Sequence, residues 1–217
     1  RGGWRSLLND PQVRLFLILA VGLVLLLIWH LMQTGLGFGQ AVRQASFNGV
    51  SIMTGTGYVS ANFSAWGGFA TTILLIVMFI GGCGGATTCG IKVFRLQVLA
   101  STAKVQISRL LRPHAVVLAY YNKRPVSVEV MDSVMGFFYL FILGFVLIAI
   151  MLGIAGLDFV TALSGAATSI SNVGPGLGEV IGADGNFSTL PGSAKWIMTF
   201  AMLLGRLEIF TVLVMLN

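Results

Sequence analysis

Residues 134–157 form a run of 24 amino acids without a charge, which is long enough to cross a lipid bilayer as one helix. A crossing helix needs about 20 apolar residues. Residues 15–29 are likewise uncharged and mostly aliphatic, and the helix they predict can extend at both ends. Only 9% of the chain is charged, whereas soluble domains average about 25%. We therefore expect an integral membrane protein and exclude a water-soluble enzyme, a disordered protein and a collagen-like fibre.

Two shorter apolar segments are interrupted. Residues 69–80 run into the glycine-rich residues 81–90, and residues 196–204 run into the charged sequence at 205–208. Both patterns are typical of a broken transmembrane helix, because irregular backbone at membrane depth must line a cavity or be buried in protein.

Between each long run and each broken one lies a moderately apolar stretch that is too short to cross. Residues 40–53 and 159–170 each end in a glycine turn, so each can enter the membrane and turn back. A shift of 117 residues aligns the first parts of the two halves and a shift of 124 aligns the rest; the extra seven residues are an insertion around 179–184.

This self-similarity predicts an all-α membrane protein made of two tandem, parallel copies of span, pore helix, turn and broken span. The first copy takes residues 1–112, a basic connection takes residues 113–129, and the second copy takes residues 130–217.

The positions of the charges predict the orientation. The net charge is +6, and seven of the thirteen Lys and Arg residues fall within residues 92–124. A basic cluster beside apolar spans marks a cytoplasmic loop, not a nucleic-acid site. Both glycine turns then face the exterior, although Arg43 and Lys195 do not follow the charge rule. Cys83 and Cys89 have no His or carboxylate nearby, which supports neither a disulfide framework nor a zinc site.

The two glycine turns favour binding of a monovalent cation. Glycines at 55, 57, 174 and 176 permit backbone shapes that other residues resist, so successive carbonyls can point at a partly dehydrated ion. Neither turn contains Asp or Glu, which fits K⁺ better than Ca²⁺. The short helix before each turn would aim the negative end of its dipole at the pore.

These turns also carry a family resemblance. Thr54-Gly55-Thr56-Gly57-Tyr58 and Ser171-Asn172-Val173-Gly174-Pro175-Gly176 resemble degenerate copies of the potassium-channel filter Thr-Val-Gly-Tyr-Gly. Residues 79–92 resemble the middle of the third repeat in TrkH-type potassium uptake proteins, and residues 205–208 resemble their last helix. The resemblance covers nearly the whole chain and is specific to the Trk/Ktr/HKT superfamily, whose members place four such repeats around one pore.

The resemblance implies the following roles. The K⁺ filter would consist of Thr54, Gly55, Thr56, Gly57, Tyr58, Ser171, Asn172, Val173, Gly174 and Pro175, and an intramembrane gate of Gly81, Gly82, Cys83, Gly84, Gly85, Ala86, Thr87, Thr88 and Arg206. It also implies two more pore repeats upstream, a homodimer in the cell inner membrane, and cytoplasmic nucleotide-binding regulatory subunits.

Arg206 has two interpretations. As the only basic residue deep inside an apolar helix, it faces a cavity or a partner: it is either one half of an ion pair with another repeat or a positive charge below the filter that contacts the gate. Glu208 lies two residues away on another helix face and is a poor partner.

Other functions stay open. A secondary transporter with broken helices that bind substrate at the midplane is the main alternative to a channel. No Ser/His pair or intramembrane Asp pair indicates an enzyme. Asn62-Phe63-Ser64 and Asn186-Phe187-Ser188 match the glycosylation pattern, but their equivalent positions in the two copies favour helix-start signals.

Overall fold

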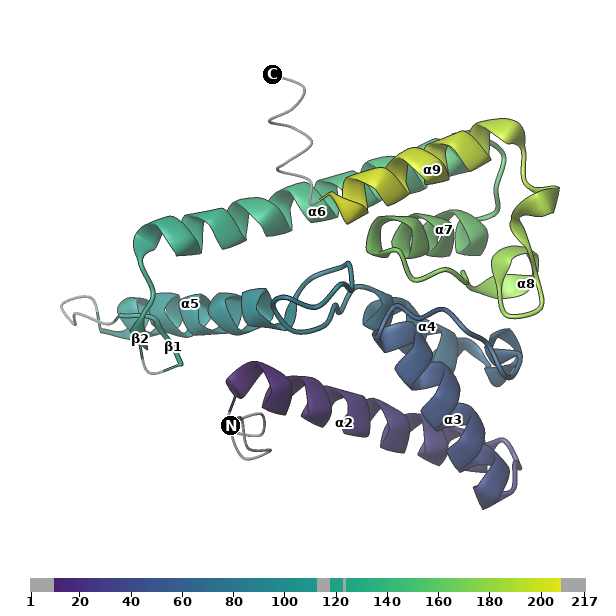
Figure 1. Ribbon diagram of the computed structural model, residues 1–217, viewed down its shortest axis with the longest axis horizontal. Helices are drawn as coiled ribbons and strands as arrows, with labels where there is room; N and C mark the ends of the chain where they lie inside the picture. Colours follow the sequence, from purple (N-terminus) through teal and green to yellow (C-terminus); the bar gives the residue numbers. More distant parts are fainter. Residues whose placement is uncertain (1–9, 113–117, 123, 208–217) are drawn as a thin grey trace.

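The computed structural model describes residues 10–112, 118–122 and 124–207, and this part of the chain is mostly helical (Figure 1). The first half contains α2 (Pro11–Gln33), α3 (Phe38–Met53), η1 (Phe63–Trp66), α4 (Gly68–Met78) and α5 (Val93–Leu111). A two-residue hairpin, β1 (Tyr120–Tyr121) and β2 (Arg124–Pro125), follows. The second half contains α6 (Val128–Ile154), α7 (Phe159–Ser171), α8 (Gly178–Ile181), η2 (Phe187–Thr189) and α9 (Gly192–Arg206).

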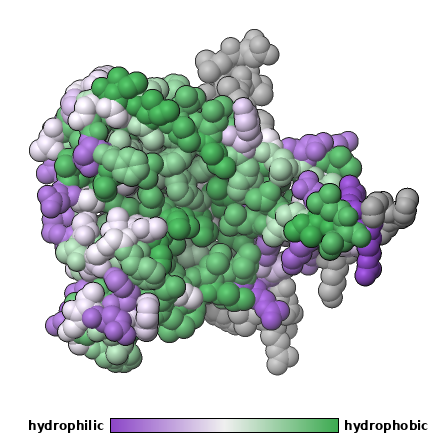
Figure 2. Space-filling model, turned by 180° about the vertical axis from the view of Figure 1, so that it is seen from behind, coloured by the Kyte–Doolittle hydropathy of each residue, from purple (hydrophilic) through white to green (hydrophobic). Residues whose placement is uncertain are grey.

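The two uncharged runs form α2 and α6, which have the length and composition to cross a membrane. Only 17% and 22% of their most apolar windows are buried inside the protein, so these helices present apolar side chains outward, unlike the core helices of a soluble domain. Figure 2 shows the resulting apolar surface across the middle of one face, with polar residues towards its edges.

Side chains at the first turns explain where several helices begin. Asp10 caps α2 by accepting a hydrogen bond from the Gln12 backbone, and Pro11 occupies the first turn of that helix. Asp158 caps α7 in the same way, with Oδ2 accepting from the Thr161 backbone at 3.1 Å.

The core consists of two clusters. In the first half α2 packs against α3, and in the second half α7 packs against both α6 and α9 (Figure 1). Ala167, Val173 and Leu177 of the second half are buried in the cluster of the first half. The segment around the second glycine turn is therefore packed into the other half of the chain.

Two details differ from the sequence-based expectations. Much of the basic cluster at residues 92–124, expected to be a loop, forms α5, whose buried Val98, Thr102 and Val105 lie on one helix face. The interruption expected from Gly205 begins later, because Gly205 and Arg206 are still in α9 and Leu207 is its C-cap. Glu208 and the apolar residues after it lie outside the described residues.

Candidate functional site

The two glycine turns leave their short helices through the same backbone hydrogen bonds. The N–H of Thr56 donates to the carbonyl of Ser51 at 2.9 Å, and the N–H of Val173 donates to that of Thr168 at 3.0 Å. The preceding residues, Gly55 and Asn172, donate to Ile52 and Ser169 and adopt left-handed φ values of 66° and 52°. These are the bonds of a Schellman motif, which ends a helix at a left-handed glycine or asparagine. Each corresponding pair is 117 positions apart.

The structure brings the two turns into contact at Gly57. This glycine has φ 77°, and a Cβ placed on it would overlap the carbonyl oxygen of Val173 and lie 3.3 Å from Cδ of Pro175. Gly174, with φ 115°, would place its Cβ 3.6 Å from the Cα of Gly57. Gly176 was expected to adopt a backbone shape that other residues resist, but its φ is not left-handed. A residue without a side chain is needed there for a different reason, because a Cβ would overlap the side chain of Ile181.

Hydroxyl groups on the buried faces of α3 and α7 hold the turns. Oγ of Ser51 donates to the carbonyl of Tyr58 at 2.6 Å, and Oγ1 of Thr168 accepts from the N–H of Gly174 at 2.9 Å. Asn48, fully buried, exchanges two hydrogen bonds with Ser60. Sequence reasoning missed these supports, although polar residues on the buried face of an otherwise apolar helix are a usable signal.

Tyr58 does not support the turn through its ring. The side chain is 72% exposed, and with Thr54 and Thr56 it lines an open groove of about 610 Å³ along α3. Only the Tyr58 carbonyl takes part in the bond to Ser51.

The glycine-rich loop, residues 79–92, joins α4 to α5 and is closed by its own hydrogen bonds. The N–H of Gly81 donates to the carbonyl of Ile91 at 2.9 Å, and the N–H of Ile91 donates to that of Phe79 at 2.8 Å. Within the loop, Gly82 N–H donates to Oγ1 of Thr88 at 2.8 Å. At its tip, Gly84 N–H donates to Oε1 of Gln12 at 2.6 Å. These bonds join the two ends of the loop to each other and hold its tip against α2.

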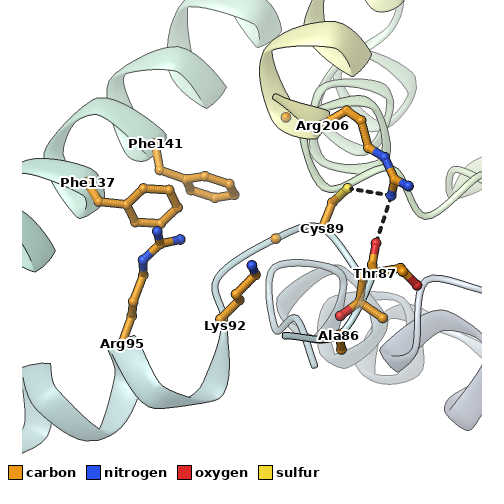
Figure 3. A pocket seen from close by; sticks show the side chains of 11 residues that line it. Ala86, Thr87, Cys89, Lys92, Arg95, Phe137, Phe141 and Arg206 are labelled. Atoms are coloured by element: carbon orange, nitrogen blue, oxygen red, sulfur yellow. Dashed lines mark hydrogen bonds between the residues drawn. The ribbon is translucent and has the colours of Figure 1, made fainter. Parts of the chain in front are cut away.

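Arg206 reaches this loop from α9 (Figure 3). Its Nη1 donates to the carbonyl of Thr87 at 2.7 Å and lies 3.6 Å from Sγ of Cys89. Gly205 allows the close approach of α9 to α7, because a Cβ there would overlap the carbonyl of Ile170. The contacts described for Arg206 are therefore with the loop; an ion pair with another repeat is not among the contacts of the described residues.

A cavity of about 190 Å³ lies between the loop, α6 and the end of α9 (Figure 3). Lys92, Arg95 and Arg206 contribute to its lining, and the guanidinium of Arg95 stacks over the Phe137 ring at 3.8 Å from the ring centre. Basic side chains therefore contribute to the lining of this cavity next to the glycine-rich loop.

Two further expectations concern individual side chains. Asn62 and Asn186 each cap a short 3₁₀ helix by accepting from the N–H of Ser64 and Ser188, which confirms the helix-start interpretation. Cys83 and Cys89 are free thiols, and within the described ranges no group of three His, Cys, Asp or Glu residues is placed to hold a metal.

Comparison with known proteins assigns the family. Residues 3–217 match the family described as TrkH, cation transport protein. The chain is 44% identical to the Trk system potassium uptake protein TrkI of Halomonas elongata, over 100% of this chain and 44% of that protein. It is 34% identical to TrkH of Escherichia coli K12, over 98% of this chain and 43% of that protein.

A solved structure agrees with this assignment. The crystal structure of the potassium transporter TrkH from Vibrio parahaemolyticus superimposes with a TM-score of 0.91 at 35% identity, covering 99% of this chain and 46% of that one. The chain spans less than half the length of the relatives it matches. On the family match and these relatives, the chain belongs to the TrkH family of cation transport proteins.

Proposed function

We propose that this chain forms part of a potassium-conducting pore whose K⁺ path is lined by the two glycine turns. The observation that carries the proposal is the contact of Gly57 with the carbonyl of Val173, since it places equivalent backbone segments of both copies at one point. The relatives named above are potassium uptake proteins and a potassium transporter, which supports K⁺ as the transported ion.

The chemistry of the turns supports selectivity by neutral carbonyl groups. Residues 54–58 and 171–175 contain no carboxylate, and the carboxyl ends of α3 and α7, with their partial negative charge, point into the turns.

The glycine-rich loop and Arg206 act as the gate in this proposal. The loop is built from small residues and reaches both α2, through Gln12, and α9, through Arg206. While the Arg206–Thr87 bond is intact, a positive charge stays beside the permeation path and repels cations. Breaking this bond would separate the loop from α9 and withdraw the charge together.

The proposal places the protein in the cell inner membrane, with the turns facing outward and α5 on the cytoplasmic side. Two further pore repeats, a second copy of the subunit and cytoplasmic nucleotide-binding subunits complete the assembly. Neither an enzymatic activity nor a nucleic-acid partner belongs to it.

A flux measurement tests the proposal against the secondary-transporter alternative. The full-length protein is reconstituted into proteoliposomes under a K⁺ gradient, and the reversal potential is measured while the Na⁺ and H⁺ gradients are varied separately. We expect reversal at the K⁺ equilibrium potential whatever the other gradients are. A reversal potential that follows the Na⁺ or H⁺ gradient would instead establish coupled transport.

A further inference from the structure

Two hydrogen bonds join the segment after the first turn to the segment after the second. Nδ2 of Asn62 donates to Oδ2 of Asp184 at 2.5 Å, and Oγ of Ser64 donates to the carbonyl of Gly178 at 2.9 Å. The bonded residues are 122 and 114 positions apart, so both bonds link the two halves of the chain. We call Asn62, Ser64 and Asp184 the outer clamp.

Asp184 belongs to the insertion that distinguishes the second half from the first. The same insertion supplies Ile181, which is 1% exposed and whose carbonyl accepts the N–H of Gly176 at 2.7 Å, next to the second turn. A Cβ on Gly182 would overlap Oγ of Ser64, so the insertion fits tightly against the first half. It therefore contacts the second turn at one point and the first half at another.

A hydrogen bond near Asn62 also connects the clamp to α3, the helix that precedes the first turn. The N–H of Ser60, two residues before Asn62, donates to Oδ1 of the buried Asn48 on α3 at 3.0 Å. The clamp thus joins two segments that are each fixed next to a turn.

We infer that the outer clamp sets the position of one glycine turn relative to the other and thereby ion selectivity. Asn62, Ser64 and Asp184 are positioning residues: their described bonds are to each other, to Gly178 and within η1, and none is to a carbonyl of either turn. Relative position matters because Gly57 has no free space beside the Val173 carbonyl, so a small shift of the second half reorients that carbonyl. This inference rests on the proposed function.

An exchange of the two side chains tests the clamp in the full-length protein. Asn62→Asp keeps the acceptor that caps η1 but places a carboxylate against Asp184, so the bond is replaced by repulsion. We expect the K⁺/Na⁺ permeability ratio to fall roughly fivefold, the equivalent of about 1 kcal/mol for one hydrogen bond. Adding Asp184→Asn restores a donor–acceptor pair in the opposite direction and should restore the ratio. Ser64→Ala, which removes the second bond with little change in shape, should give a smaller fall.

The second half supplies a matched control. Asn186 caps η2 as Asn62 caps η1, but its described hydrogen bonds are all to Ser188. Asn186→Asp should therefore leave the ratio unchanged. Measuring the amount of folded protein by size-exclusion chromatography separates selectivity from folding.

The outcomes separate this inference from the proposed function when Gly174→Ser is measured in parallel. If Gly174→Ser lowers the ratio while Asn62→Asp and Ser64→Ala do not, the clamp is wrong and the filter assignment stands. An Asn62→Asp loss that Asp184→Asn does not rescue also overturns the clamp, as does a loss of folded protein at unchanged selectivity. If no variant changes the ratio, including Gly174→Ser, the filter assignment fails and the clamp fails with it.

Discussion

Replacing Gly57 by serine perturbs both turns at once. Gly57 has φ 77°, and any Cβ there overlaps the carbonyl oxygen of Val173 in the other turn. Gly174 is also held in a conformation that favours glycine, at φ 115°, but its Cβ would meet only the Cα of Gly57 at an ordinary 3.6 Å. Strain at Gly174 therefore falls on its own backbone, whereas strain at Gly57 displaces a carbonyl proposed to bind the ion.

The magnitudes separate the two substitutions. A left-handed conformation costs a residue with a Cβ about 1–2 kcal/mol, and this cost applies at both positions. Overpacking adds roughly 1–3 kcal/mol, and it applies only at Gly57. If the displaced Val173 carbonyl weakens K⁺ binding relative to Na⁺ binding by about 1.4 kcal/mol, the permeability ratio changes roughly tenfold. We expect Gly57→Ser to lower the K⁺/Na⁺ permeability ratio about tenfold and Gly174→Ser to lower it less.

The assay is the reversal potential of the full-length protein in proteoliposomes with K⁺ and Na⁺ on opposite sides. Gly35→Ser is the matched control, because Gly35 has φ 90° and a Cβ placed on it would meet no atom within 4 Å, so it reproduces the backbone strain away from the turns. A wild-type ratio in Gly57→Ser, in protein folded as well as Gly35→Ser, would refute the assignment of the Val173 carbonyl as an ion ligand.

Three further predictions concern the gate and a helix cap. Deleting part of residues 82–88 should raise K⁺ flux and weaken regulation while leaving selectivity unchanged; unchanged flux in a folded deletion would reduce the loop to a packing element. Arg206→Ala should raise flux per folded molecule, because it removes a charged hydrogen bond to Thr87 of about 1.5–3 kcal/mol, and Arg206→Gln should give an intermediate flux; loss of folded protein without a gain in flux would indicate a structural role instead. The hydrogen bond from the Thr161 side chain holds the pKa of Asp158 below its ordinary value of 3.8. The ionised Asp158 therefore adds to the free energy of unfolding at pH values above 3.8, and this contribution is lost as the pH falls through the lowered pKa. Thermal unfolding in detergent should show this acid-side loss, and Asp158→Asn should abolish it while Asp158→Ala should cost about 1 kcal/mol at neutral pH; an unaltered acid-side loss in Asp158→Asn would assign it to other carboxyl groups.

The sequence alone predicted the features that depend on local composition. Charge-free length predicted α2 and α6, because the thickness of a bilayer fixes how many apolar residues a crossing helix needs. The glycine-rich segment after residue 80 predicted that the preceding apolar helix, α4, ends there. Sequence did not predict that much of the basic cluster at residues 92–124 is helical. In α5 the buried residues are few and charged residues interrupt the apolar ones, so a search for long uncharged runs does not detect this helix.

Only the tertiary structure decided which distant groups meet. The bond from Arg206 to Thr87 joins residues 119 positions apart, and the bond from Asn62 to Asp184 joins residues 122 positions apart. Periodicity describes which face of a helix is apolar but carries no information about which copy that face will contact. The repeat predicted two equivalent turns, and the packing of Val173 into the core of the first half placed one against the other.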